Sequence, residues 1–169
     1  MLDSPSQSLG TTQTFDLTAR QKEVRAVFAT AAKYFLIYGG SRSGKTFLTI
    51  YTIITRMIKA PGSRHVVFRN DGIDAKQSIG NETIPSVLKL AYPGLVLKWH
   101  DQDGYYEAPN GSQLWLAGLK DKARLDKVLG KEFCTIYLNE ASQITLEAFS
   151  VVQTRLAQVV MQTNGKRLP

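Results

Sequence analysis

The sequence predicts an α/β fold in which helices cover both faces of a mainly parallel sheet. Three observations predict it. Short apolar runs expected to be strands recur along the chain, stretches with helical periodicity alternate with them, and a glycine-rich loop joins the first run to the helix after it. A chain of 169 residues can form one domain with its own core. We place that domain at residues 15–169 and expect residues 1–14, which lack apolar periodicity, to be a flexible N-terminal tail.

The composition is typical of a soluble globular protein. Hydrophobic residues make up 43% of the chain and charged residues 21%, and no segment is apolar enough for a membrane span. Cys134 is the only cysteine, which excludes an internal disulfide and favours a reducing compartment. The net charge of +7 permits an anionic partner such as a nucleotide or nucleic acid, but it is equally compatible with a merely basic protein.

The first half of the chain is expected to alternate between helix and strand. Residues 18–34 carry apolar side chains at helical spacing, with Thr18 as the expected N-cap. The apolar run 35–38 predicts a strand, the stretch from about Lys45 to Lys59 predicts a helix, and residues 64–69 predict a second strand.

The second half contains an insertion into that plan. Residues 75–92 are expected to form a helix that is broken near Pro85. Three short runs follow, and the Asn-Gly pair at 110–111 between the last two predicts a hairpin. A strongly buried strand from Phe133 comes next, and apolar residues at three- or four-residue steps then predict an amphipathic helix over 146–160.

The glycine-rich loop carries the strongest functional signal. It fits the pattern G-x-x-x-x-G-K-[ST], with an expected strand before it and a helix after it, which is the context that the motif requires. Glycines allow positive φ angles, so successive backbone N–H groups can turn toward a phosphate, and the N-terminus of the helix adds its dipole. Lys45 can reach the β- and γ-phosphates, and the Thr46 hydroxyl can ligate Mg²⁺. The predicted nucleotide-binding residues of the loop are Gly39, Gly40, Ser41, Arg42, Ser43, Gly44, Lys45 and Thr46.

The strand from Phe133 ends in two polar residues that predict the catalytic end of the same site. Glu140 is the candidate general base, since a carboxylate there can polarise a water in line with the γ-phosphate. Asn139 stands where an Asp usually holds Mg²⁺ through its water shell. Its amide oxygen can still accept a hydrogen bond from metal-bound water, but the missing charge should weaken Mg²⁺ binding.

Four further residues each keep two interpretations. Arg42 could stabilise charge on the γ-phosphate or face solvent, and Gln21 could read the adenine edge or be an exposed helix residue. Arg69 and Arg124 could serve DNA or a neighbouring subunit's nucleotide, or could belong to the solvated surface. Neither histidine has metal-ligand neighbours at useful spacing, so we expect no metal other than Mg²⁺ bound with nucleotide.

Together these motifs resemble those of the ATPase domain of the large terminase subunit, the DNA-packaging motor of tailed bacteriophages and related viruses. Four segments carry the resemblance: LTARQ, GGSRSGKT, the hairpin region YYEAPNGSQLWLAGLKDKARLDKVLGKEF, and IYLNEASQI. The pattern NGS…L.G, followed by a short basic stretch, GKEF and NEAS, is more specific than the phosphate loop alone. The resemblance covers roughly residues 15–160.

The resemblance implies an ASCE (RecA-like) P-loop NTPase fold that hydrolyses ATP, with Mg²⁺, to translocate double-stranded DNA into a procapsid. It also implies a ring of subunits at the portal protein, a small terminase subunit as partner, and a location in the cytoplasm of the infected host cell. Carried over by position, Gln21 matches the adenine-reading glutamine, Arg42 the arginine inside the loop, and Glu140 the catalytic base. The family's coupling-motif strand and C-terminal nuclease domain are not found in this sequence, so we expect no nuclease activity from this chain.

Two other classes of function remain open. A helicase- or recombinase-like ATPase would share the loop and Glu140 but should carry further nucleic-acid motifs on a second motor domain. A nucleotide-gated assembly module is the non-enzymatic alternative, in which Asn139 has blunted hydrolysis. A small-molecule kinase is disfavoured, because no Arg-rich lid segment is present and a catalytic Glu suits the activation of water.

Overall fold

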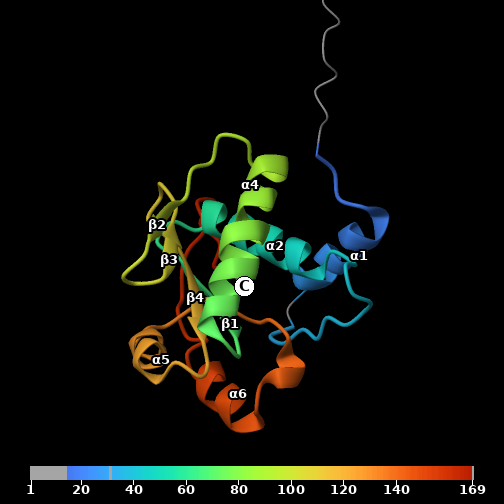
Figure 1. Ribbon diagram of the computed structural model, residues 1–169. Coiled ribbons are helices and arrows are strands. Elements are labelled where there is room, and N and C mark those ends of the chain that lie inside the picture. Colours follow the sequence, from blue (N-terminus) through green and yellow to red (C-terminus); the bar gives the residue numbers. More distant parts are fainter. Residues whose placement is uncertain (1–14, 31, 169) are drawn as a thin grey trace, which may run out of the picture.

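Five strands form one mixed sheet in a computed structural model that describes residues 15–30 and 32–168 (Figure 1). The strand order is β2-β3-β4-β1-β5, in which β1 pairs in parallel with both β4 and β5, while β2, β3 and β4 pair antiparallel. The predicted α/β fold with an inserted hairpin is thereby confirmed. The expected tail at 1–14 lies outside the described residues. The strands are β1 (Arg64–Arg69), β2 (Lys98–His100), β3 (Tyr105–Glu107), β4 (Gln113–Gly118) and β5 (Thr135–Leu138).

Helices pack against the sheet through two separate apolar clusters. Along β1, Val67 belongs to a cluster with residues of α2 and α4, whereas Val66 and Phe68 belong to a cluster with residues of α5 and α6. This alternation places the two clusters on opposite faces of the sheet, because successive side chains of a strand point to opposite sides. The helices are α1 (Ala19–Phe28), α2 (Lys45–Lys59), α3 (Gly72–Asp74), the π-helical η1 (Ala75–Thr83), α4 (Ile84–Ala91), α5 (Lys122–Leu129), the 3₁₀ turn η2 (Ala141–Gln143) and α6 (Leu146–Gln153).

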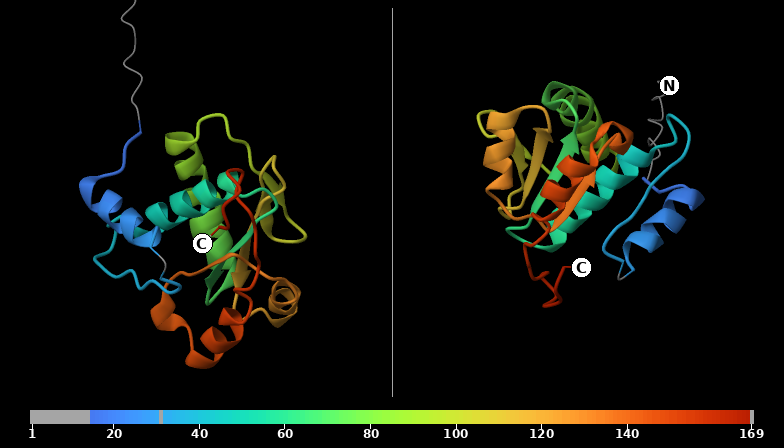
Figure 2. Two further views of the ribbon diagram at one scale, coloured as in Figure 1. Left: turned by 180° about the vertical axis from the view of Figure 1, so that it is seen from behind. Right: turned by 90° about the horizontal axis from the view of Figure 1, so that it is seen from below.

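Helix α2 is the element that ties the loop before it to the sheet. Four of its apolar residues, spaced three or four apart, are almost completely buried: Ile50, Ile53, Ile54 and Met57. Arg56 reaches across to the start of β5, where its Nε donates to Thr135 Oγ1 at 2.8 Å and its Nη2 to the carbonyl oxygen of Cys134 at 3.2 Å. Helix α1 packs on α2 on the side away from the strands (Figure 1 and Figure 2).

The predicted hairpin is confirmed and extends to a three-stranded antiparallel unit. Gly111 has a φ of 77° in the turn between β3 and β4. The side chain of Asn110 fixes this turn from both ends: its Oδ1 accepts from the backbone N–H of Ser112 at 3.1 Å, and its Nδ2 donates to the carbonyl oxygen of Met57 at 2.8 Å. The turn is therefore also attached to the end of α2.

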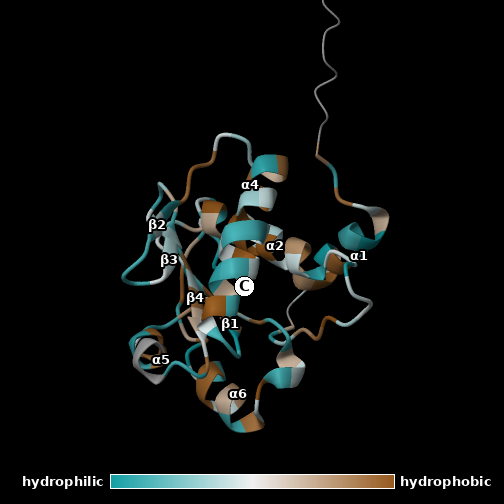
Figure 3. Ribbon diagram, in the orientation of Figure 1, coloured by the Kyte–Doolittle hydropathy of each residue, from teal (hydrophilic) through white to brown (hydrophobic). Residues whose placement is uncertain are grey.

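The prediction of a strand at residues 35–38 is wrong. This stretch has no regular secondary structure and pairs with no strand among the described residues. Most of its apolar side chains are exposed, with Leu36 at 84% and Tyr38 at 87%, and brown colour marks apolar residues of the stretch in Figure 3. A strand needs a neighbour for its N–H and C=O groups, and among the described strands β5 pairs only with β1. Because β5 lies at the edge of the sheet, its residues are half-buried rather than strongly buried.

Two helix predictions need correction. The helix near Pro85 is not broken: η1 runs to Thr83 with π-helical winding, and α4 continues from Ile84 with Pro85 in its first turn, where a missing N–H is tolerated. The last helix is shorter than expected and ends at Gln153. Beyond it the backbone turns back to the sheet, since Phe133 N–H donates to the carbonyl oxygen of Arg155 at 2.8 Å.

The first helix is also shorter than residues 18–34, because α1 ends at Phe28. Its start is as predicted. Thr18 is the N-cap, its Oγ1 accepts from Gln21 N–H at 3.3 Å, and Gln21 Oε1 accepts from Thr18 N–H at 3.0 Å. This reciprocal pair is a capping box.

Gly118, at the end of β4, is required by a close approach of two backbone segments. A Cβ atom at this position would overlap the backbone nitrogen of Gly72 and would lie 2.7 Å from its Cα atom. We expect Gly118→Ala to lower the free energy of unfolding by roughly 1–3 kcal/mol, the usual range for overpacking, as measured by urea denaturation. Gly130→Ala is the control, because its Cβ would meet its nearest atom at 3.5 Å. Equal stability of both variants would contradict the close approach.

Candidate functional site

The loop from Gly39 to Thr46 leads directly into α2, as the motif requires, but the strand that the motif requires before it is not formed. Gly39 and Gly44 have φ angles of 148° and 77°, in the region that favours glycine. Gly44 is the N-cap of α2, and no side chain accepts a hydrogen bond from the first turn. The first N–H groups of the helix thus remain open toward the loop, together with the positive end of the helix dipole. This arrangement suits an anion.

Lys45 folds back into the loop. Its Nζ donates to the carbonyl oxygens of Gly39 at 2.9 Å and Gly40 at 2.6 Å, and to Ser43 Oγ at 3.1 Å. Three contacts hold the ammonium group at the centre of the loop, where an anion bound by the backbone N–H groups would meet it. Ser41 is exposed at the tip of the loop.

Arg42 and Glu140 share an unusual backbone. They are the two residues other than glycine with positive φ in the described part of the chain, at 59° and 58°. Such a conformation costs roughly 1 kcal/mol or more for a residue with a Cβ atom, and it concentrates at functional sites. The Arg42 side chain is exposed and makes no hydrogen bond or ion pair with any described residue.

Gln21 lies beside the loop but already has a structural role. Its Oε1 closes the capping box of α1, as described above. Its Nε2 would be 3.0 Å from a Cβ atom placed on Gly44, so the amide group lies against the last glycine of the loop. The Nε2 is the end of this amide that can serve a ligand.

Glu140 follows β5, and its carboxylate is bound by an arginine from the neighbouring strand. Arg69 closes β1, and its Nη2 donates to Glu140 Oε1, while Gln143 Nε2 donates to Glu140 Oε2 at 3.2 Å. The other side of the guanidinium is fixed as well, since Nη1 donates to Ser78 Oγ at 2.6 Å. The Arg69 side chain is only 13% exposed. The interpretation of Arg69 as a solvated surface residue is therefore wrong. The side chain of Arg124 lies outside the described part of the chain, so its two interpretations are not tested.

The ion pair between Arg69 and Glu140 shifts the pKa of both groups. The hydrogen bond from Arg69 lowers the pKa of Glu140 below its ordinary value of 4.5, and the same bond raises the pKa of Arg69. Glu140 therefore stays ionised to a lower pH than a free glutamate does. Both of its oxygens are engaged by protein donors.

Tyr137 is the residue of this site that the sequence analysis missed. It lies on β5 opposite Val67 of β1, two residues before Asn139. Its hydroxyl donates to Asn139 Oδ1 at 2.9 Å, and its ring packs against the apolar cluster that includes α2. Burial raises the pKa of Tyr137. Of the two predicted metal-site residues, Asn139 thus contacts this tyrosine after β5, while Thr46 lies in the first turn of α2.

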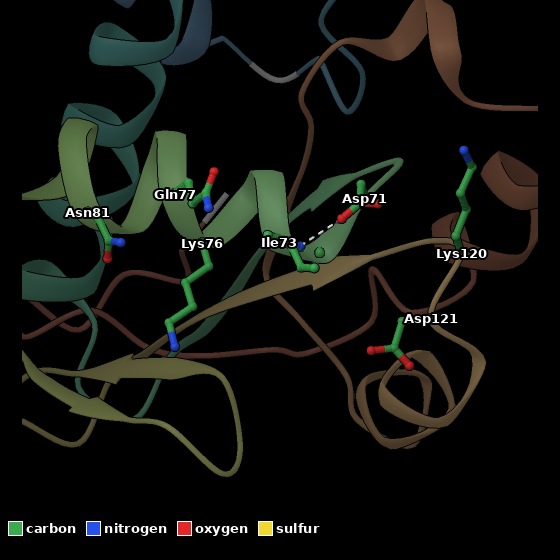
Figure 4. A pocket seen from close by; sticks show the side chains of 8 residues that line it. Asp71, Ile73, Lys76, Gln77, Asn81, Lys120 and Asp121 are labelled. Atoms are coloured by element: carbon green, nitrogen blue, oxygen red, sulfur yellow. Dashed lines mark hydrogen bonds between the residues drawn. The ribbon is translucent and has the colours of Figure 1, made fainter.

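A separate pocket of about 710 Å³ opens at the same edge of the sheet (Figure 4). Asp71 follows β1 there, and its Oδ1 accepts from the backbone N–H of Ile73 at 2.8 Å. Lys76, Lys120 and Asp121 also line it, so its walls carry both signs of charge. None of the predicted site residues lines this pocket, and it is distinct from the loop.

The described residues contain no cluster of three or more His, Cys, Asp or Glu side chains that could hold a metal ion. None of the described helices has both the length and the apolar character that crossing a membrane requires.

Comparison with known proteins gave one family and several solved structures. A family model described as "Terminase large subunit, T4likevirus-type, N-terminal" matches residues 36–158. The structure of the large terminase from a thermophilic bacteriophage aligns with a TM-score of 0.71 at 15% identity, over 85% of this chain and 37% of that one. The comparison with curated proteins gave no match.

Two further structures of the same thermophilic phage terminase were determined with nucleotides. The ADP complex aligns with a TM-score of 0.68 at 17% identity, over 84% of this chain and 36% of that one. The ATP-γ-S complex aligns with a TM-score of 0.65 at 14% identity, over 88% and 36%. This chain thus spans a little over a third of the terminases that it matches, and at these identities the likeness shows the fold.

Removing Arg69 should change the titration of Glu140. In Arg69→Ala we expect the Glu140 pKa, measured by NMR of the carboxyl carbon, to rise toward 4.5, because the hydrogen bond that favours the charged form is lost. The matched control is Arg20→Ala, which removes an exposed ion pair with Glu23. The ion pair stabilises the fold above pH 4.5 and is lost as the pH falls through the lower folded value. An unchanged Glu140 pKa in Arg69→Ala would show that Arg69 is not the cause of the lowered pKa.

Proposed function

This chain belongs to the family of terminase large subunits, and on that premise we propose that it is the ATPase domain of a motor that packages double-stranded DNA into a procapsid. The observation that carries the proposal is the loop. It combines positive-φ glycines, an uncapped helix N-terminus and a lysine held at its centre. The complexes of the thermophilic phage terminase with ADP and ATP-γ-S support nucleotide as the ligand.

In this proposal the loop binds the triphosphate of ATP. Backbone N–H groups of residues 39–46 surround the phosphates, and Lys45 exchanges its contacts with the carbonyl oxygens of Gly39 and Gly40 for the β- and γ-phosphates. Arg42, exposed at the rim of the loop, can close over the γ-phosphate, and Gln21 Nε2 can donate to the base.

The residues present fit Mg²⁺ bound together with nucleotide. Thr46 and Asn139 supply oxygen atoms, the ligand type that Mg²⁺ prefers, and the Asn139 oxygen also accepts from the Tyr137 hydroxyl. The ion would neutralise charge on the β- and γ-phosphates. Since Asn139 brings no negative charge, most of the affinity for the ion has to come from the phosphates.

Glu140 is the proposed general base. It lies at the end of β5, and its two oxygens are bound by Arg69 and Gln143. The bond from Arg69 lowers the pKa of the carboxylate and so makes it a weaker acceptor for a proton from water, until the pair is loosened. We therefore expect slow hydrolysis by this chain alone, and faster hydrolysis when double-stranded DNA, the portal protein, the small terminase subunit or neighbouring subunits of a ring rearrange the pair. The site of action is then the cytoplasm of the infected host cell.

The pairing of Glu140 with Arg69 favours one second candidate function, a nucleotide-gated assembly module that binds ATP without hydrolysing it. A helicase- or recombinase-like ATPase shares the same loop, but no observation on this structure favours it.

Phosphate release with and without double-stranded DNA separates these possibilities. We expect Glu140→Ala to reduce the rate by roughly 100-fold or more, the usual contribution of a general base, while Glu132→Ala, at an exposed position, matches the unchanged protein. Lys45→Ala should abolish ATP binding in a calorimetric titration and leave the circular dichroism spectrum intact. ATP turnover by Glu140→Ala at the rate of the unchanged protein would exclude Glu140 as the general base. An unchanged ATP affinity of Lys45→Ala would exclude the loop as the phosphate-binding site.

Restoring a charge at position 139 should strengthen the metal site. We expect Asn139→Asp to lower the Mg²⁺ concentration that half-saturates nucleotide binding, because a carboxylate attracts the ion more strongly than a neutral amide. The measurement is a Mg²⁺ titration of the binding of a fluorescent ATP analogue. A higher half-saturating concentration in Asn139→Asp would show that residue 139 does not face the ion.

A further inference from the structure

The last part of the described chain lies at the end of the sheet opposite the glycine-rich loop. Helix α2 begins at the loop and ends at Lys59, about 22 Å further on for a helix of 15 residues. There Thr163 N–H donates to the carbonyl oxygen of Lys59 at 2.9 Å, and Arg64 N–H, at the start of β1, donates to Gln158 Oε1 at 2.7 Å. Residues 155–168, red in Figure 2, thus lie along the amino ends of the parallel strands and the end of α2.

This segment brings basic side chains to that end of the sheet without acidic ones. Residues 148–168 contain three basic residues and no acidic residue. The end of α2 and the start of β1 supply one basic residue each. We call these five residues the basic edge: Lys59, Arg64, Arg155, Lys166 and Arg167.

The basic edge is not neutralised within the described part of the chain. None of its five side chains forms an ion pair or a hydrogen bond with a described residue. Two acidic residues belong to the same side of the sheet. Glu132, just before β5, is exposed, and Glu107, at the end of β3, is bound to His100. The basic edge therefore keeps an excess of positive charge, which attracts anions.

Arg155 is the residue of the basic edge that the fold explains least. Its Nε atom is buried, and no described group accepts a hydrogen bond from it. Its backbone is fixed beside β5, because its carbonyl oxygen accepts from Phe133 N–H at 2.8 Å. A buried donor without an acceptor costs free energy, so packing within the chain gives no reason for an arginine here. A guanidinium group suits a phosphate, which it can bind through two parallel hydrogen bonds.

The arrangement of the five cations suits a polymer better than a single ion. They come from the end of a helix, the start of a strand and a segment of 14 residues, so they are spread along the sheet end, and none of them lines the pocket of Figure 4. Double-stranded DNA carries a negative charge about every 1.7 Å along its axis, and Arg and Lys side chains are the usual partners of its phosphates.

We propose that the basic edge binds the phosphodiester backbone of double-stranded DNA. The choice of DNA as the polyanion rests on the proposed function. Nucleotide and DNA then contact opposite ends of α2, the nucleotide at Lys45 and the DNA beyond Lys59. Changes at the basic edge should consequently weaken DNA binding and leave ATP binding as it is.

The test combines Arg64→Gln, Arg155→Gln and Arg167→Gln in the full chain. The probe is a short fluorescently labelled DNA duplex, titrated at several salt concentrations. Each phosphate contact contributes roughly 0.9 to the slope of log K against log salt concentration, so we expect weaker binding and a slope smaller by roughly 2–3. An unchanged slope would overturn the proposal.

The matched control removes three positive charges elsewhere. Lys33, Lys89 and Lys98 are exposed and lie outside the basic edge, and their combined change to Gln should leave the slope close to that of the unchanged protein. The same loss in both triple variants would overturn the proposal, because net charge alone would then explain it.

A second triple variant keeps the proposal testable if the first folds poorly. Lys59→Gln, Lys166→Gln and Arg167→Gln change exposed residues only and should reduce the slope in the same way.

Arg155→Leu separates binding from folding. We expect this variant to be at least as stable as the unchanged protein in urea denaturation, because it removes a donor that has no acceptor, and yet to bind the duplex more weakly. A less stable Arg155→Leu with unchanged duplex binding would overturn the proposal.

An acidic protein surface is the other partner that this charge could attract, and a polyglutamate peptide is the probe for it. If the basic-edge variants lose the peptide but bind the duplex like the unchanged protein, the proposal is overturned. Titration with a fluorescent ATP analogue separates the inference from the proposed function. An unchanged protein that binds the duplex through the basic edge but no ATP analogue contradicts the proposed function alone. One that binds the analogue but no duplex overturns the inference and leaves the nucleotide site standing.

Discussion

The packing of α2 against the β1–β5 pair is the constraint on which the candidate site depends. The helix begins at Lys45 and its buried face rests on the sheet, so the position of the loop follows from the position of the helix. Arg56, in the last turn of the helix, holds it to the start of β5. Because Glu140 follows the same strand, this attachment links the position of the loop to that of Glu140.

The parallel register of β1 and β5 brings the second pair of groups together. Phe68 lies opposite Leu138, and Asn139 N–H donates to the carbonyl oxygen of Phe68 at 2.9 Å. The residues that follow each strand therefore emerge at the same edge, where Arg69 meets Glu140. The positive φ of Glu140 turns the chain at this point. The cost of that conformation is offset by the ion pair and by the hydrogen bond from Gln143.

Features that depend on a few neighbouring residues could be predicted from the sequence. The conformation of the loop, the Asn-Gly hairpin and the Thr18 cap each follow from local chemistry, and all three are found in the structure. The strand expected at 35–38 fails because an apolar run cannot by itself supply a pairing partner. The end of the last helix was missed because Gln153 is followed by contacts to the loop before β5, which no helical pattern encodes.

The contacts between side chains of the site could not be predicted from the sequence either, because they join residues that are far apart along the chain. Arg69 and Glu140 are 71 positions apart, and only the strand register makes them neighbours. Tyr137 looked like an ordinary strand residue, although a polar tip on the face of β5 that meets α2 is a signal that could have been noticed.

The central proposal is that the loop binds the triphosphate of ATP. A crystal structure of the protein with ATP-γ-S and Mg²⁺ tests it most directly. We expect phosphate oxygens within hydrogen-bond distance of the backbone N–H groups of residues 39–46. Lys45 Nζ should have moved from the carbonyl oxygen of Gly40 to the phosphates. A nucleotide bound elsewhere on the protein, with Lys45 still on Gly40, would contradict it.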